Sequence, residues 1–367
     1  MPWCVTRSLL CFAVTTNSDR EKGIRIIMKT VLVTGAGGYI GSILVRELLK
    51  NGYSVIAYDR FYFGREVFKE IRVDDRLLLA QKDIRDIEPS DLEGVDIVCD
   101  LAALSNDPSG EIDKSLTYAI NHKGRARVCA AAKKAGVSRY ILSSSCSAYG
   151  AGEGVELNEE SPTSPITAYA DSTLRAEVDA FKHSDRSFIV SALRNATVFG
   201  LSPRMRFDLV INLMTLHAVE KGVITVMGGG RQWRPLVHVH DVARAFCAVM
   251  EANKDTVNGQ VFNIGLTNLQ VRSMAFIVRE TLPIPVIVNL APDDADRRNY
   301  NVSFAKAKRV LGYEAGTTVE DGVREVYDAL KYGRVEANAK TVTVNWYRSI
   351  LDAKSLIDGV ELNGRII

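Results

Sequence analysis

Three glycines at intervals of three residues form the segment with the clearest chemical meaning. Gly35, Gly38 and Gly41 follow an apolar, β-branched run at 30–34 and open a run with helical periodicity. One glycine allows a tight turn, one lets the backbone approach a pyrophosphate, and one lets helix and strand pack closely. The amino end of the helix then offers free N–H groups and a positive dipole to the phosphates. The spacing therefore predicts a dinucleotide site, and an ordinary glycine turn before a helix is the alternative.

Two carboxylates extend this prediction toward the nucleoside of the cofactor. A second strand-like run at 54–58 ends in Asp59, about 20 positions past the glycines, where a ribose diol would be bound. A carboxylate opposes a 2′-phosphate, so the sequence favours NAD, while the neighbouring cation of Arg60 keeps NADP open. Further on, Asp83 can accept a hydrogen bond from an adenine amino group.

Alternating strands and helices must position these residues. Six runs have the character of buried parallel strands and lie at 30–34, 54–58, 77–80, 95–103, 139–143 and 187–194. Helical periodicity is clear at 39–50, 115–135 and 166–183. This alternation predicts an α/β fold, a doubly wound parallel (Rossmann) sheet that binds ligands at the carboxyl ends of its strands. Shorter strand-like runs follow at 224–227, 261–264 and 286–288.

The chain is long enough for a nucleotide-binding part and a smaller, discontinuous α/β lid that binds substrate. The predicted boundaries are 28–200 with 234–264 for the first part, 201–233 with 265–353 for the lid, 1–27 for a disordered extension and 354–367 for a tail.

Composition and charge exclude several classes of function. The net charge of the 367 residues is +2 with both signs interspersed, so neither nucleic acid nor a membrane surface is an expected partner. The six cysteines are scattered, which favours buried free thiols and a reducing, cytoplasmic location. His238 and His240 have no third ligand nearby in the sequence, so no metal site is expected.

A second group of reactive side chains follows the fifth strand. Residues 143–150 read SSSCSAYG, and Tyr169 lies on the next predicted helix. Together with TGAGGYIG at 34–41 and RNATVFG at 194–200, these motifs resemble the extended short-chain dehydrogenase/reductases of the nucleotide-sugar epimerase/dehydratase group. The resemblance runs from about residue 28 to 353. It is specific for the family and much less so for the reaction.

The resemblance implies a role for two hydroxyl groups. The phenolate of Tyr169 would take a proton from a sugar hydroxyl while the nicotinamide takes hydride from the same carbon. Ser145 would bridge the sugar oxygen and the tyrosine. The residues expected around the cofactor are Gly35, Gly38, Tyr39, Ile40, Gly41, Asp59, Arg60, Asp83, Ile84, Leu101, Ala102, Ala103, Asn121, Ser143 and Tyr169.

One catalytic position departs from the family pattern. The family has a lysine four residues after the tyrosine, where this chain has Thr173. That lysine binds the nicotinamide ribose and lowers the pKa of the tyrosine; without it, only about one tyrosine in 10³ is ionised at pH 7. Three interpretations stay open: a slower enzyme activated by the nicotinamide charge alone, a reaction with less or no hydride transfer, or a degenerate site.

Arginine-bearing loops in the second half favour a substrate with a diphosphate, because the guanidinium fork suits phosphate oxygens. They lie at 202–208, 228–235 and 296–300. The resemblance implies that Arg234 and Arg297 (or its neighbour Arg298) hold the diphosphate. Arg204 and Asn212 would line the same pocket, and Ser145 and Asn195 complete the expected substrate set.

The expected function is NAD-dependent 4-epimerisation of a nucleoside-diphosphate sugar through a transient 4-keto sugar. A 4-ketoreductase or dehydratase is the nearest alternative, and a dehydratase is disfavoured because Cys146 and Ser147 provide no carboxylate after Ser145. Thr173 keeps a non-redox isomerase or mutase open. The resemblance also implies a homodimer formed by the helices at 115–135 and 166–183.

Overall fold

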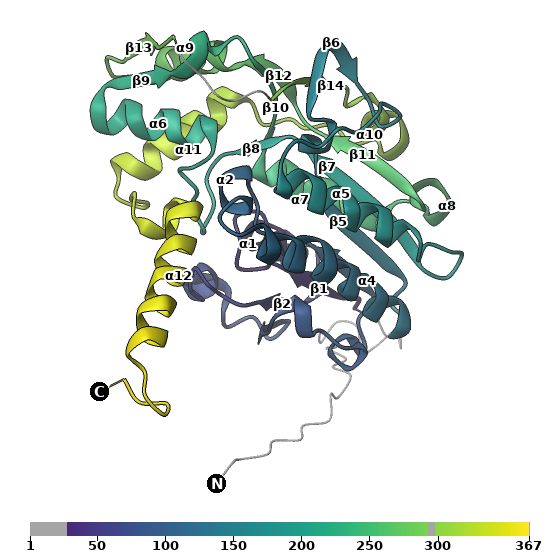
Figure 1. The fold of residues 1–367 in the computed structure, drawn as a ribbon. Helices are drawn as coiled ribbons and strands as arrows, with labels where there is room; N and C mark the ends of the chain where they lie inside the picture. Colours follow the sequence, from purple (N-terminus) through teal and green to yellow (C-terminus); the bar gives the residue numbers. More distant parts are fainter. Residues whose placement is uncertain (1–27, 293–297, 367) are drawn as a thin grey trace, which may run out of the picture.

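A seven-stranded parallel sheet forms the centre of the computed structural model, which describes residues 28–292 and 298–366 (Figure 1). The strand order is β11-β7-β5-β4-β1-β2-β3. Their bounds are β1 (Thr30–Thr34), β2 (Ser54–Asp59), β3 (Leu77–Gln81), β4 (Ile97–Asp100), β5 (Arg139–Ser145), β7 (Ile189–Asn195) and β11 (Gln260–Ile264). Every pairing in this sheet is parallel, which confirms the predicted doubly wound fold.

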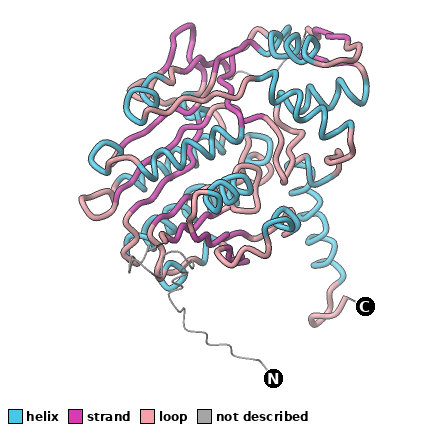
Figure 2. Tube along the Cα trace, turned by 180° about the vertical axis from the view of Figure 1, so that it is seen from behind, coloured by secondary structure: helices cyan, strands magenta, loops and turns pink. Residues whose placement is uncertain are grey.

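Helices cover both faces of the sheet because its strands are apolar on both sides. In β1, Val31 and Val33 belong to one buried cluster and Leu32 belongs to the other. The first cluster includes α1 (Gly41–Lys50) and α7 (Val239–Glu251), and the second includes α4 (Arg125–Lys134) and α5 (Ala168–Phe181). The view from behind shows the helices lying along the strands (Figure 2).

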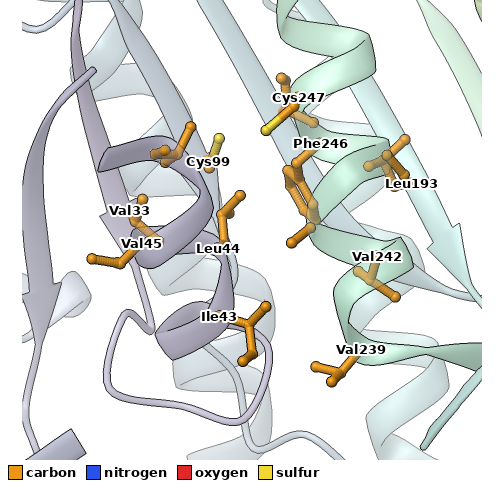
Figure 3. Close-up of a cluster of buried hydrophobic side chains, with 14 of the residues drawn as sticks. Val33, Ile43, Leu44, Val45, Cys99, Leu193, Val239, Val242, Phe246 and Cys247 are labelled. Carbon is orange, nitrogen blue, oxygen red and sulfur yellow. The ribbon is translucent and has the colours of Figure 1, made fainter. Parts of the chain in front are cut away.

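The contact between α1 and α7 shows how the glycine-rich turn is anchored. Figure 3 shows Leu44 of α1 near Phe246 of α7, with Cys99 and Leu193 of the sheet in the same cluster. Burying an aliphatic or aromatic side chain of this size is worth about 1.5–3 kcal/mol. The four described cysteines are buried free thiols, as predicted; the other two lie outside the described residues.

The short strands of the second half take two different places. The run predicted at 261–264 is β11, which pairs with β7 at the edge of the central sheet. The runs at 224–227 and 286–288 instead form a separate two-stranded sheet of β9 (Val223–Val226) and β13 (Ile287–Leu290).

A smaller α/β unit covers the carboxyl ends of the central strands (Figure 1). Its other strands are β8 (Thr197–Phe199), β10 (Trp233–His238) and β12 (Thr267–Gln270), and β6 (Ala151–Leu157) pairs with β14 (Asn299–Val302). Its helices are α6 (Val210–Lys221), α9 (Val271–Thr281) and α11 (Val319–Lys331), whereas α10 (Ala305–Leu311) packs beside β11 in the first core cluster. Phe199, Ile211, Leu236 and Met274 lie in its core.

The last helix, α12 (Thr343–Val360), returns to the nucleotide-binding half (Figure 1). The Trp346 indole nitrogen donates to the carbonyl of Tyr62 at 2.8 Å, and the Tyr347 ring lies 5.7 Å from that of Phe63. Residues 354–360, predicted as part of a tail, continue this helix. Within the described ranges, no helix is long and apolar enough to cross a membrane.

Candidate active site

A cavity of about 810 Å³ lies at the carboxyl ends of the central strands and beneath the smaller unit. The predicted cofactor residues on its wall are Gly35, Gly38, Tyr39, Ile40, Gly41, Asp59, Arg60, Asp83, Ile84, Leu101, Ala102, Ala103, Ser143 and Tyr169. The predicted substrate residues on its wall are Ser145, Asn195, Arg204 and Arg234. Asn121, Thr173 and Asn212 lie elsewhere, and Arg297 is outside the described residues.

The glycine-rich turn borders the cavity, and the backbone around it leaves no space for side chains at Gly35 and Gly41. Gly35 has a φ of +65°, and a Cβ there would lie 2.8 Å from backbone atoms of Leu101 and Ala102. A Cβ on Gly41 would lie 2.2 Å from the Gly35 carbonyl oxygen. No side chain caps the amino end of α1. An uncapped helix end that faces a cavity past a glycine turn fits a phosphate anion.

Asp59 is positioned at the end of β2 by its own loop. Its carboxylate accepts hydrogen bonds from the backbone N–H groups of Gly37 at 3.0 Å and Phe61 at 2.5 Å. Burial raises the pKa of this carboxyl, whereas these hydrogen bonds and the charge of Arg204 oppose the rise. A buried acceptor on the cavity wall fits a ribose diol.

The Asp83 carboxylate is already bound by two arginines. Arg60 lies 2.7 Å from it and Arg85 lies 2.6 Å from it. Burial alone would raise the pKa of Asp83, but the hydrogen bonds from both arginines outweigh burial and hold the pKa well below its usual range. Arg60, the cation that kept NADP open, is therefore paired within the protein.

Asn212 supports the site from behind its wall, which corrects its predicted place in the pocket lining. Its Nδ2 donates to the Tyr39 hydroxyl oxygen at 3.1 Å, and its Oδ1 accepts from the Gly200 N–H at 2.9 Å. The Tyr39 hydroxyl in turn donates to the Gly200 carbonyl at 2.5 Å. The buried amide thus fixes Tyr39 next to the glycine-rich turn.

Ser145 and Tyr169 meet at the opposite end of the cavity. Ser145 ends β5, and its hydroxyl oxygen accepts hydrogen bonds from the N–H and hydroxyl of Ser147 at 3.2 and 2.9 Å. Tyr169 lies in the first turn of α5, whose amino end is capped by the Thr167 hydroxyl. Burial raises the pKa of Tyr169, and the neighbouring Ser145 hydroxyl partly lowers it. Both hydroxyl-bearing residues line the same cavity.

The charges around Tyr169 come from three other segments. Asp107, in α2 (Asp107–Gly110), raises the pKa of the phenol, whereas Arg125 and Arg206 lower it. Thr173 adds no charge: it is buried, and its hydroxyl has no hydrogen-bond partner within the described part of the chain.

Asn121 holds the loop after β4 and does not reach the cavity wall. Its side chain accepts from the N–H of Leu104 at 2.8 Å and donates to the carbonyl of the same residue at 3.2 Å. It lies in a π-helical stretch at Tyr118–Gly124, which interrupts the single helix predicted at 115–135.

Two neighbouring arginines on the cavity wall differ in their pairing. Arg206 forms a two-pronged pair with Asp208, both hydrogen bonds being 2.9 Å. Arg204 donates one nitrogen to the Thr343 hydroxyl at 2.9 Å, while Nε and Nη1 are buried without partners among the described residues. Burial of the unpaired cation lowers the pKa of Arg204 to about 9. Such a guanidinium fits an anionic ligand group.

The arginines of the distal loops also reach the cavity. Arg234 donates to the carbonyls of Trp233, at 2.8 Å, and of Arg298, and lies over the ring of Tyr300. Arg298 is paired with Asp107. Asn195 lies nearby at the end of β7, with a buried Oδ1 that has no partner within the described ranges. Its Nδ2 donates to the Ser143 hydroxyl at 3.0 Å.

Three charged or aromatic residues illustrate what sequence reasoning missed on the cavity wall. Arg125 lies one helical turn after Asn121, so the buried face of that helix could have indicated it. Asp107 lies in a polar loop with no distinguishing pattern. Tyr347 reaches the wall from α12, and no local signal predicts that contact.

Similar proteins match this arrangement over most of the chain. A protein of Bacillus subtilis (strain 168), described as an uncharacterized UDP-glucose epimerase, YtcB, is 28% identical over 80% of this chain and 95% of its own length. UDP-glucuronic acid 4-epimerase from Bacillus cereus, solved with UDP-glucuronic acid and NAD, is 25% identical with a TM-score of 0.73, covering 83% of this chain and 99% of its own. DesIV, a dTDP-glucose 4,6-dehydratase from Streptomyces venezuelae solved with NAD, is 27% identical with a TM-score of 0.75, covering 84% and 99%.

The family model gives the assignment. It matches residues 31–265, which include the glycine-rich turn, Ser145 and Tyr169. This match confirms the predicted family and NAD as the cofactor. The chain belongs to the NAD dependent epimerase/dehydratase family.

Proposed function

We propose that this protein epimerises carbon 4 of a nucleoside-diphosphate sugar. The observation that carries the proposal is that Ser145 and Tyr169 line one cavity together with the glycine-rich turn. The similar Bacillus proteins, whose descriptions name UDP-glucose and UDP-glucuronic acid, support a UDP-sugar as substrate.

The chain's own residues move the proton in this reaction. Bound NAD supplies a reversible hydride acceptor, so the sugar suffers no net oxidation. Tyr169 removes the proton of the 4-hydroxyl, and Ser145 holds the sugar oxygen beside the phenol. After the 4-keto sugar has turned its opposite face toward the cofactor, Tyr169 returns the proton to the oxygen at carbon 4. The unpartnered Oδ1 of Asn195 can accept from a ligand hydroxyl at this end.

The arginines divide between the two ligands in this proposal. Arg234 of β10 lies on the same cavity wall as Arg298, and we place the sugar diphosphate there; Arg297 remains a predicted contact. Arg204 lies over the Phe63 ring at 3.6 Å and acts on the pKa of Asp59. We therefore assign Arg204 to the cofactor rather than to the substrate.

Two carboxylates on the cavity wall are already engaged by other side chains, which favours epimerisation over dehydration. A dehydratase needs an acid and a base beside the tyrosine. Asp107 accepts from Thr167 at 2.5 Å and from Arg298, and Asp208 is paired with Arg206. Cys146 is buried, which raises the pKa of its thiol. The one observation that favours a second candidate, a non-redox isomerase or mutase, is the uncharged Thr173 beside the base.

The test uses a panel of UDP-, dTDP-, GDP- and CDP-sugars carrying deuterium at carbon 4. Epimerisation should yield the 4-epimer with its deuterium retained and without net change in NADH absorbance. A 4-keto-6-deoxy product with the deuterium moved from carbon 4 to carbon 6 would instead establish a dehydratase. Full activity after removal of bound cofactor would overturn the redox mechanism, whereas loss of activity that added NAD restores supports it.

We also propose a homodimer formed by α4 and α5. Ala130 of α4 is exposed, and Val178 of α5 is an apolar side chain that is 51% exposed on the monomer. Ala130→Arg should halve the mass measured by light scattering, whereas Ala337→Arg, on an exposed loop far along the chain, should not. An unchanged mass for both variants would contradict the proposed interface.

A further inference from the structure

The proposed base lies in surroundings that oppose its ionisation. Burial and Asp107 both raise the pKa of Tyr169, and the residue one turn later in α5 is the uncharged Thr173. A tyrosine acts as a base near neutral pH only when a positive charge stabilises its phenolate. A cation that the protein itself supplies must therefore come from another element.

Arg206 is poorly suited to this role because all its donors are engaged. Nε and Nη2 bind the two oxygens of Asp208, and Nη1 donates to the Ser105 hydroxyl at 3.1 Å. The carboxylate of Asp208 thus neutralises Arg206 on the cavity wall itself.

Arg125 is differently placed, on the floor of the cavity beneath the strand ends. Its side chain is 1% exposed, and Nη2 donates to the carbonyls of Ser143 at 2.6 Å and Asp100 at 2.9 Å. These carbonyls lie in β5 and β4, and Ser143 is two residues before Ser145. Nη1 has no hydrogen-bond partner among the described residues, and Arg125 lines the cavity.

The carboxylate that balances Arg125 is held on the side away from the cavity wall. Asp100 lies 3.4 Å from Nε, and it also accepts from the hydroxyls of Thr34, at 2.5 Å, and Tyr140. Asp100 does not line the cavity, whereas Arg125 does. Its negative charge is spread over three donors, so the positive end of the pair faces the site.

We propose that Arg125 supplies the positive charge that makes Tyr169 a usable base, so that the reaction needs no lysine at position 173. The inference rests on the proposed role of Tyr169 as the base. Arg125 acts through the field at Tyr169 and is a positioning residue. A buried ion pair seldom adds to stability, which is a reason to look for another role for this one. The competing explanation is that Arg125 only ties β4 to β5.

Moving the positive charge from position 125 to position 173 separates the two explanations. Arg125→Gln should lower turnover about 10–100-fold and move the pH midpoint of turnover up by about one unit or more, because an opposite charge shifts a pKa by 1–3 units. Arg125→Lys should keep most of the activity. Thr173→Lys, added to Arg125→Gln, should restore both rate and midpoint, since it returns a cation to the side chain one turn after Tyr169. A purely structural tie predicts loss without a midpoint shift and no rescue by Thr173→Lys.

A second readout is independent of turnover. 3-Fluorotyrosine placed at position 169 reports ionisation of the phenol by ¹⁹F NMR, with and without NAD. Arg125→Gln should raise the titration midpoint by about one pH unit or more. Arg127→Gln, which removes an exposed arginine of the same helix, should leave it unchanged. An unshifted midpoint in a folded Arg125→Gln variant overturns the proposal, even if no sugar nucleotide is ever converted; a shifted midpoint without conversion would leave Arg125 in place and reject the epimerase.

Discussion

The two ends of the cavity are built in different ways. At the catalytic end, Ser145 and Tyr169 project from a central strand and the helix packed on it, and both line the cavity. At the end near Asp59, Arg204 lies between segments distant in sequence and keeps two buried nitrogens without described partners. The catalytic end is therefore preorganised by the sheet, whereas the other end is completed only when an anion binds.

The largest effect is expected from a substitution that removes the base at the catalytic end and leaves the Asp59 end intact. Tyr169→Phe should lower turnover by about 10³-fold, because loss of a general base typically costs 10²–10⁴-fold. The melting temperature should stay close to the wild type, and NAD affinity should change far less than turnover, since the phenol is not part of the Asp59 end. Tyr332→Phe, at a 67% exposed position, is the matched control. A variant that keeps a tenth of the activity would exclude Tyr169 as the base.

The next largest effect is expected at the end of the cavity near Asp59. Arg204→Met should weaken NAD binding about 10–100-fold, because hydrogen bonds to charged groups are worth about 1.5–3 kcal/mol. The same change should raise the melting temperature of the cofactor-free protein by about 2 °C, because it removes an unpaired buried cation. Calorimetry and thermal unfolding measure the two effects, with exposed Arg186→Met as control. A lower melting temperature would mean that the guanidinium is paired after all.

A pH series should separate the two ends without mutation. The pKa of Tyr169 lies above its ordinary value, so the phenol is protonated at pH 7 and the active phenolate grows as pH rises. Turnover should therefore increase about tenfold per pH unit above 7 until the pH passes the pKa of Tyr169. NAD affinity should stay nearly constant between pH 7 and 8.5. Turnover that is flat across this range would count against a titrating phenol.

The smallest effect is expected from α12, the helix that lies against the end of the cavity near Asp59. Tyr347→Ala removes an aromatic contact with Phe63 and should weaken NAD binding about 3–10-fold, in keeping with about 0.5–1.5 kcal/mol for such a pair. Turnover at saturating NAD should not change. Leu356→Ala, on the part of α12 that faces solvent, should affect neither quantity. Equal losses in both variants would show that helix integrity, not the ring contact, matters.

Local patterns predicted the central strands and the short motifs that follow them well. The strand at Thr30–Thr34, the glycine-rich turn and the strand that ends in Asp59 each need only a few consecutive residues to specify them. Tyr169 and Ser145 lie within short motifs of the same kind. All these positions face one cavity because parallel strands bring their carboxyl ends together.

Contacts between distant segments explain what the sequence did not reveal. Arg125 was not singled out, because its meaning depends on the carbonyls of two strands that fold above it. Asn212 was placed on the pocket wall, whereas tertiary packing turns its amide toward Tyr39. The contact of Tyr347 with Phe63 joins residues nearly 300 positions apart and leaves no periodic signal.

The position of β11 has a consequence for how the chain is made. Every residue of β7 is buried in the finished protein, yet its outer neighbour β11 begins only at Gln260. A ribosome adds about 5–20 residues per second, so a nascent chain carries β7 with an open, apolar edge for several seconds. An open edge of this kind pairs readily with other chains. Synthesis of many chains close together should therefore yield aggregated protein, whereas synthesis of few chains at a time lets each chain supply its own last strand before it meets another.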